Sequence, residues 1–119
     1  MEQFPSILDT HPYLRQTLDL VSDKWITAII YVLSRGKRRY GELQREIGGV
    51  SQRMLTRTLR NLEKDGLVRR EEFTTPSLMV EYSLTPLGET LVEPLQSLCQ
   101  WSVDYFDEVR RARESNPSQ

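Results

Sequence analysis

The chain has 119 residues and a formal net charge of −1, a length typical of one domain. Counting glycine but not tyrosine as apolar, 46 residues or about 39% are apolar, below the ~45–50% usual for a soluble domain. We therefore expect an elongated shape completed by a second copy, because a chain of this size buries only about two-thirds of its unfolded surface. The longest apolar run, Ala28–Leu33, has six residues, against the ~20 of a membrane-spanning helix, which excludes membrane insertion.

The start of the chain shows no basic region before an apolar run, so no export signal is predicted. The single cysteine, Cys99, and the single histidine, His11, can form neither an internal disulfide nor a zinc site. We predict a reduced, cytoplasmic protein without metal or cofactor. Catalysis is not expected, because no nucleophile and base can be paired and His11 is better explained as a helix cap or surface residue.

Charge is distributed unevenly along the chain. Residues 35–70 contain eleven Lys and Arg against four acids, so this segment is strongly basic and the rest is acidic. Such an asymmetry is the usual footprint of a protein that binds a polyanion. A merely solvated charged face is the alternative, and the motifs inside the segment decide between the two.

Two helices are predicted before the basic segment, after an N-terminal arm at residues 1–10. The first covers residues 12–21 and is capped by Thr10 or His11, with a proline in its opening turn. The second, residues 24–34, is apolar on nearly all sides. This pattern is typical of a helix packed by several neighbours, so we expect it at the centre of the core.

Residues 40–65 have the pattern of two helices separated by a glycine turn. The first helix ends at Gly48 and Gly49, and Ser51 is a good N-cap for the second because its hydroxyl can accept a hydrogen bond from an orphan amide. Gly66 can adopt the left-handed conformation that ends a helix. Helix, short turn, helix is the helix-turn-helix arrangement.

A β-hairpin, the wing, is predicted next at residues 67–84. Residues 67–73 and 78–84 are strand candidates, and the second alternates between apolar and polar positions. A hairpin centred on the loop between them places Arg70 opposite Glu81, a favourable cross-strand pair. The predicted fold class is mainly α with a small β-hairpin wing, a winged helix-turn-helix.

A C-terminal helix is predicted over residues 85–113, which completes a single domain at 11–113 and leaves 114–119 as a disordered tail. Pro94 should kink or interrupt the helix, because proline removes a backbone hydrogen bond. Residues recur along it at intervals of three and four, as in a helix-pairing seam. We expect a homodimer interface formed by Leu91, Leu95, Leu98, Trp101, Ser102, Tyr105 and Val109.

The helix at residues 51–65 has one apolar and one basic face. Leu55, Leu59 and Leu62 point to one side. In a helix-turn-helix the second helix enters the major groove, where Arg reads guanine, Gln reads adenine and Thr touches the thymine methyl. The residues of these types in its N-terminal half, which we expect to read bases, are Gln52, Arg53, Thr56 and Arg57.

Other polar residues are better placed for phosphates, which position a protein on DNA without reading sequence. In the helix-turn-helix they are Lys37, Arg38, Arg39, Ser51, Arg60 and Lys64, and at the wing tip they are Thr74, Thr75 and Ser77. A solvated surface is the alternative for each group. On the helix, the absence of an acid before Glu63 favours DNA, since a solvated face usually alternates its charges.

Two features of the helices allow two interpretations each. Cys99 lies among apolar residues and is predicted to be buried; the alternative is a redox-responsive thiol near the dimer axis, which requires exposure and a lowered pKa. Trp25, Trp101, Tyr105 and Phe106 could line a ligand cavity between the central and terminal helices. Aromatic residues at helical spacing are more often core or interface.

An ordered series of segments covers most of the chain between residues 11 and 107: Leu18–Trp25, Arg39–Leu43, Gly49–Thr56, Leu59–Val68, Val80–Gly88 and Trp101. This series resembles the HxlR family of bacterial transcriptional regulators, within the broader MarR-like winged-helix group. The resemblance implies a homodimer, joined through its terminal helices, that binds a palindromic operator in double-stranded DNA near a regulated gene. It places the recognition helix at residues 51–65 and the wing at 73–78.

One departure from the family pattern bears on regulation. Many members have cysteine and proline at the start of the first helix, and some sense electrophiles or oxidants through that cysteine, whereas this chain has His11 and Pro12. Sensing by that thiol is therefore not expected, and Cys99 is not a positional substitute. The overall prediction is a sequence-specific transcriptional regulator, repressor or activator, with no effector identified. The alternative is a winged-helix module that binds protein through the same surface.

Overall fold

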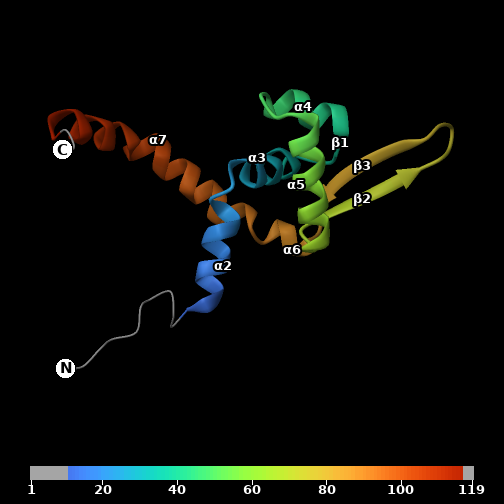
Figure 1. Cartoon of the computed structure of the whole chain (residues 1–119), viewed down its shortest axis with the longest axis horizontal. Coiled ribbons are helices and arrows are strands. Elements are labelled where there is room, and N and C mark those ends of the chain that lie inside the picture. Colours follow the sequence, from blue (N-terminus) through green and yellow to red (C-terminus); the bar gives the residue numbers. More distant parts are fainter. Residues whose placement is uncertain (1–10, 117–119) are drawn as a thin grey trace.

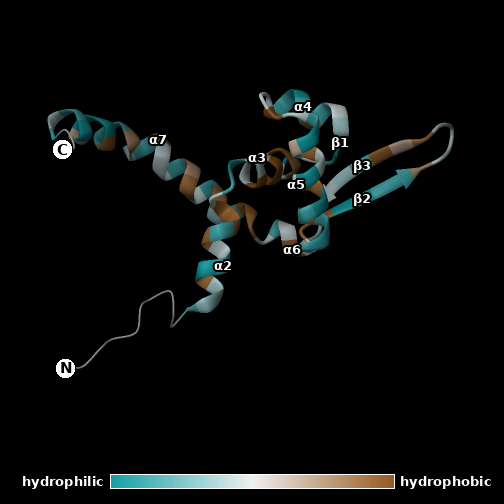
Figure 2. Ribbon diagram, in the orientation of Figure 1, coloured by the Kyte–Doolittle hydropathy of each residue, from teal (hydrophilic) through white to brown (hydrophobic). Residues whose placement is uncertain are grey.

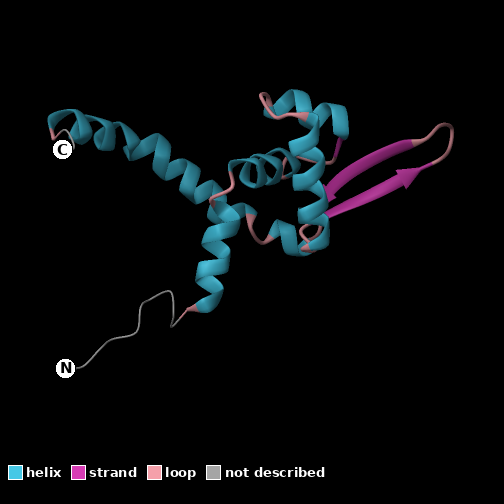
Figure 3. Ribbon diagram, viewed as in Figure 1, coloured by secondary structure: helices cyan, strands magenta, loops and turns pink. Residues whose placement is uncertain are grey.

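The computed structural model describes residues 11–116, and its elements follow the predicted order (Figure 1). The helices are α2 (Pro12–Val21), α3 (Lys24–Leu33), α4 (Tyr40–Ile47), α5 (Gln52–Lys64), α6 (Pro86–Glu89) and α7 (Val92–Ser115); the strands are β1 (Arg38–Arg39), β2 (Val68–Phe73) and β3 (Met79–Leu84). With principal extents of 66 × 37 × 25 Å, the chain is elongated, as its composition predicts. Figure 3 shows the wing and α7 leaving the body in opposite directions.

Helix α3 lies at the centre of the core, as its apolar sequence predicts. Ile29, Ile30 and Leu33 are at most 3% exposed, and the helix contacts α2, α4, α5, α7 and β3. In Figure 2 the apolar colouring of α3 contrasts with the more polar colouring of α5 and β2. The carboxylate of Asp23 caps the helix by accepting a hydrogen bond from the amide of Trp25.

Both ends of α5 carry the predicted signals. The Ser51 hydroxyl accepts a hydrogen bond from the amide of Met54 at 3.1 Å. After the helix, Gly66 has a φ of +77°, and the amide of Leu67 donates to the carbonyl of Leu62 at 2.9 Å. These features define a Schellman motif, which fixes the length of α5 and the direction in which the chain enters the wing.

The inward face of α5 is the predicted one. Leu55, Leu59 and Leu62 are at most 2% exposed. Thr58 is also buried, and its hydroxyl donates to the carbonyl of Met54 at 2.8 Å, so no polar group is left unsatisfied there. Packing of this face against the core turns the opposite, basic face outward.

The wing belongs to a three-stranded antiparallel sheet with the order β1-β3-β2. Strand β1 was not predicted. In it, Arg38 pairs with Tyr82 and Arg39 pairs with Glu81. A strand of two residues has no alternation that a sequence can display, so only the contact with β3 reveals it.

The register of the hairpin differs by one residue from the prediction. Arg70 lies opposite Tyr82, and Glu81 lies opposite Glu71, so the predicted pair of Arg70 and Glu81 was wrong. The loop begins after β2 and includes Leu78, which precedes β3 and is 71% exposed. Because side chains alternate between faces, a slip of one residue removes a predicted cross-strand neighbour.

The C-terminal helix is interrupted, as predicted, but just before Pro94. Helix α6 ends at Glu89 and α7 begins at Val92, so Pro94 lies in the first turn of α7. A proline there breaks no hydrogen bond, because the amides of a first turn have no partner within the helix. Helix α7 reaches Ser115, slightly beyond the predicted end, so residues 114 and 115 of the expected tail are helical.

Helix α6 is held tightly against the end of α5. The Thr85 hydroxyl caps α6 by accepting a hydrogen bond from the amide of Gly88 at 3.0 Å, and it donates to the carbonyl of Gly66. At Gly88 a Cβ atom would overlap the carbonyl oxygen of Leu67. This close approach requires a glycine.

Helix α2 forms where the sequence predicts it, but it has no buried residue. His11 occupies the N-cap position, although its side chain makes no capping hydrogen bond. Thr10, the other predicted cap, lies outside the described residues, as do the rest of the arm and residues 117–119. No helix between residues 11 and 116 is both long enough and apolar enough to cross a membrane.

Candidate nucleic-acid interface

The outward face of α5 brings together the four residues predicted to read bases. Gln52, Arg53 and Arg57 are exposed and Thr56 is half-buried. All four line one shallow, open hollow along the helix, together with Arg60 and Asn61. Asn61 was not predicted, although it follows Arg57 by one helical turn and its amide can both donate and accept.

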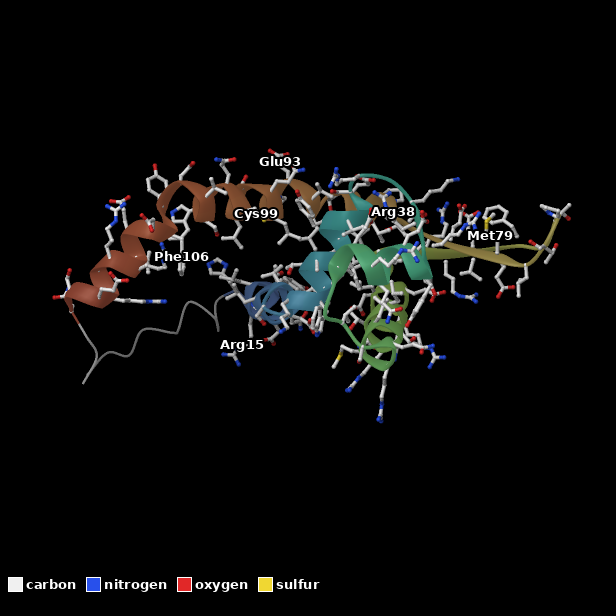
Figure 4. The ribbon with its side chains drawn as sticks, turned by 90° about the horizontal axis from the view of Figure 1, so that it is seen from above. Arg15, Arg38, Met79, Glu93, Cys99 and Phe106 are labelled. Carbon is white, nitrogen blue, oxygen red and sulfur yellow. The ribbon has the colours of Figure 1, made fainter. Side chains whose placement is uncertain are left out.

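No ion pair among the described residues neutralises the cations of this face. Among the described residues, none of the α5 cations Arg53, Arg57, Arg60 and Lys64 forms an ion pair with a carboxylate. Figure 4 shows long nitrogen-tipped side chains extending from α5 on the side of the body away from α7. An unneutralised basic surface of this kind attracts a polyanion.

Tyr40 joins α4 to α5 at the edge of this face, and sequence reasoning missed its role. The Tyr40 hydroxyl donates a hydrogen bond to the backbone carbonyl of Gln52 at 2.8 Å. The same oxygen lies 2.9 Å from Oγ1 of Thr56. A partner sixteen residues away leaves no spacing signal in the sequence.

Arg38, predicted to contact phosphate, is instead engaged within the protein. Its Nε donates to Oε2 of Glu46 at 2.8 Å, and its Nη1 donates to the carbonyls of Gly36 and Lys37 at 2.9 and 3.0 Å. The side chain is only 19% exposed. The guanidinium therefore braces the turn before α4.

The two neighbours of Arg38 remain accessible. The Nζ of Lys37 lies 3.5 Å from Oε1 of Glu81, but the lysine side chain is 66% exposed. Arg39 is exposed, and its backbone amide donates to Oε1 of Glu42 at 2.8 Å, which helps to cap α4. Both cations lie beside the first helix of the motif, which crosses the DNA backbone in this geometry.

The wing tip presents the three predicted hydroxyl residues to solvent. Thr74, Thr75 and Ser77 are all exposed in the loop between β2 and β3.

Nearer the body, Nη1 of Arg70 donates a hydrogen bond to Oε1 of Glu72 at 2.9 Å. The Glu72 carboxylate and the Tyr82 hydroxyl raise the pKa of Arg70, so this guanidinium stays charged.

Arg70, although paired with Glu72, is a further cation near α5 that the sequence did not identify. With Arg60, it lines a second, polar hollow between α5 and the sheet, which also contains Tyr40, Glu63 and Tyr82. Its position on a predicted strand did not show that it lies near Arg60, because the hollow is formed only when the sheet packs beside α5.

Comparison with known proteins identifies this arrangement. A family model described as HxlR-like helix-turn-helix matches residues 20–110. The chain belongs to this family. It is 42% identical over 92 residues to the HTH-type transcriptional regulator YkvN of Bacillus subtilis strain 168, an alignment that covers 77% of this chain and 78% of YkvN.

Solved structures agree with the assignment to the HxlR-like family. A transcriptional regulator of the MarR family from Enterococcus faecalis V583 matches with a TM-score of 0.74 and 38% identity, covering 92% of this chain and 99% of that one. The regulator YtfH from Salmonella typhimurium matches with a TM-score of 0.77 and 34% identity, covering 93% and 99%. This HxlR-like protein is thus a transcriptional regulator with a helix-turn-helix DNA-binding fold, and its relatives are regulators rather than enzymes.

Along α7, the residues of the predicted seam lie in two environments. Near its start the seam packs on the chain's own core, where Leu95 is buried and Leu91 is half-buried. Val109 is also half-buried, and the remaining seam residues are exposed: Leu98, Trp101, Ser102 and Tyr105. The rings of Trp101 and Tyr105 contact each other in a tilted arrangement, with centroids 6.0 Å apart and an interplanar angle of 44°. Most of this HxlR-like helix therefore has an apolar face without a partner among residues 11–116.

Cys99 is exposed, so the prediction of a buried thiol was wrong. It follows Leu95 by one turn, on the stretch of α7 that leaves the body (Figure 4). With Tyr31, Val32 and Ile47, Cys99 borders an open, mainly apolar hollow between α3, α4 and α7. The aliphatic neighbours in its sequence lie on α7 itself and do not enclose the sulfur.

The four aromatic residues of the alternative ligand cavity are not gathered around one cavity. Trp25 packs against the core, whereas Trp101, Tyr105 and Phe106 are exposed on α7. The structure thus favours core and interface roles for them. Across residues 11–116, no group of three or more His, Cys, Asp or Glu side chains is placed to hold a metal ion.

Proposed function

We propose that this regulator acts in the cytoplasm as a homodimer that binds a palindromic operator near the operon it represses or activates. The basic, outward face of α5 carries the proposal, because it gathers four side chains suited to base edges and its cations form no ion pair among the described residues. In a helix-turn-helix, such a face enters the major groove.

The side chains on this face divide into two roles. Gln52, Arg53, Thr56 and Arg57 contact bases, because they lie in the N-terminal half of α5. Contacts to phosphates come from the ends of the motif and from the wing tip: Lys37, Arg39, Ser51, Arg60, Lys64, Thr74, Thr75 and Ser77. Arg38 supports these contacts indirectly by bracing the turn before α4.

Two unpartnered surfaces support a dimer. The seam of α7 beyond Leu95 exposes Leu98, Trp101 and Tyr105, which are 47–56% exposed. Helix α2 has no buried residue: Leu20 and Val21 pack against the edge of the core, but Tyr13, Leu14 and Leu18 are 40–80% exposed. A second copy would cover this apolar surface, which a monomer rarely leaves open. A two-fold axis would then present two copies of α5 to half-sites ~34 Å apart, one turn of DNA.

The experiment that tests the proposal measures binding of the purified protein to the DNA upstream of its own gene and to a scrambled duplex, across a series of salt concentrations. We expect tighter binding to the native sequence and a loss of affinity with salt, with a log-log slope of about −0.9 per neutralised phosphate. Weak binding without preference and without steep salt dependence would contradict the proposal and favour a module that binds protein through the same surface.

A further inference from the structure

The hydroxyl group of Tyr40 determines how the hydroxyl of Thr56 can bond. The Tyr40 oxygen lies 2.8 Å from the carbonyl oxygen of Gln52 and 2.9 Å from Oγ1 of Thr56. A tyrosine hydroxyl has one hydrogen, and a carbonyl oxygen can only accept. The Tyr40 hydrogen therefore goes to Gln52, and the bond to Thr56 is made with the hydrogen of the threonine hydroxyl.

This assignment limits what Thr56 can offer to DNA. Thr56 lies at the border of two hollows, since it lines both the base-facing hollow of α5 and the polar hollow beside the sheet. Its single hydroxyl hydrogen is directed to Tyr40 in the second hollow. The side chain is left with its methyl group and a lone pair for a base edge.

The bases differ in what such a side chain can recognise. Guanine O6 and N7, adenine N7 and thymine O4 are acceptors that need a donor, and Thr56 has none free. The remaining lone pair could accept a hydrogen bond from adenine N6 or cytosine N4, but only thymine presents a methyl group that the Thr56 methyl can contact in the major groove. An apolar contact between the two methyl groups requires no hydrogen bond.

We propose that Tyr40 makes Thr56 a reader of the thymine methyl group, by holding its hydroxyl away from the bases. Tyr40 is then a positioning residue, which acts on specificity through Thr56 and through the backbone of Gln52 without touching DNA. This inference rests on the proposed function, since it names the chemical group that one residue of the recognition helix reads.

The test replaces each thymine of the operator by uracil, one position at a time, which removes only the methyl group. The operator is first selected from random duplexes with the wild-type protein. We expect one position in each half-site where uracil weakens wild-type binding about three- to fivefold, the effect of one methyl group removed from a buried contact. Replacement at thymines elsewhere serves as the control.

Two substitutions of Thr56 separate the methyl group from the hydroxyl. T56V keeps a methyl group and removes the hydroxyl, so it should retain the uracil effect. T56S keeps the hydroxyl and removes the methyl group, so it should bind thymine and uracil duplexes equally at that position. Thermal unfolding of both variants checks that α5 is intact.

Y40F tests the positioning role. Without the Tyr40 oxygen, the Thr56 hydroxyl regains a free hydrogen and can donate to a base acceptor. We expect the preference for thymine at this position to broaden toward purines, which offer N7, whereas the double variant Y40F/T56V should keep the thymine preference. A merely structural role of Tyr40 would weaken binding to all sequences equally.

Several outcomes would overturn the inference and leave the proposed function standing. They are selective operator binding with no position sensitive to uracil, a preference for adenine or cytosine that T56V abolishes, or a uracil effect that survives in T56S. A protein without any operator preference would instead contradict the proposed function, and this inference with it.

Discussion

The Nε of Arg38 donates a hydrogen bond to Oε2 of Glu46 at 2.8 Å, which ties β1 to the last turn of α4. Arg38 also donates to two carbonyls of the turn that precedes it. Arg38, the middle residue of three consecutive cations, thus helps to hold the helix-turn-helix in place. Lys37 and Arg39 on either side remain open to solvent.

Arg38→Ala should therefore lower the free energy of unfolding by about 1 kcal/mol, since it removes an ion pair and two hydrogen bonds at a partly exposed site. Lys37→Ala is the matched control, because this side chain is mostly exposed. It should leave stability nearly unchanged and weaken binding to operator and random DNA alike. Urea unfolding and a DNA-binding assay measure the two effects. Equal stability of the two variants would contradict the bracing role of Arg38.

Arg57→Ala and Arg60→Ala should affect DNA binding in different ways. Arg57 lies in the N-terminal half of α5 and Arg60 nearer its end, although both line the same hollow. Loss of Arg57 should cost about 1–3 kcal/mol on the operator and relax specificity at one position, whereas loss of Arg60 should weaken all sequences similarly. Competition assays with operator and random duplexes measure this difference. Equal losses for both variants on both DNAs would refute the division of roles.

Leu98→Asp should yield a monomer, because it places a charge in the proposed interface on α7. Leu98 is 56% exposed in the single chain, so the substitution should leave the fold intact. Gln96→Asp is the control, since Gln96 is exposed on the opposite side of α7. Light scattering measures the mass, and circular dichroism checks helicity. An unchanged dimer for Leu98→Asp would rule out this interface.

Gly88→Ala should destabilise the fold by about 3 kcal/mol, because the new Cβ overlaps the carbonyl oxygen of Leu67 and α6 must move. Gly41→Ala provides the control within α4. There a Cβ would meet Nη1 of Arg45 at 3.4 Å, an ordinary contact with a flexible side chain. Alanine is the better helix former, so Gly41→Ala should stabilise by up to about 1 kcal/mol. Thermal unfolding of the two variants should shift in opposite directions.

The features that the sequence predicted correctly are local ones. The Ser51 cap, the left-handed Gly66 and the inward leucines of α5 each depend on residues within a few positions of one another. Such signals can be recognised from the spacing of residues in the sequence, because capping and helical periodicity are properties of a single helix or strand. They sufficed to define the recognition helix and to gather its four base-reading candidates on one face.

Tertiary structure alone decided the features that depend on distant partners. Strand β1 exists because β3 lies beside it, and Arg70 faces Tyr82 because the loop keeps Leu78 outside β3. Arg38 is hydrogen-bonded to Glu46, and the Tyr40 hydroxyl is hydrogen-bonded to that of Thr56. Cys99 is exposed because α7 leaves the body without enclosing its side chain. The sequence by itself thus determined the class of fold, the helix that we propose to meet DNA and the chemistry of its outward face. Which of its polar groups remain free to act depended on contacts between elements far apart in the chain, which no local pattern encodes.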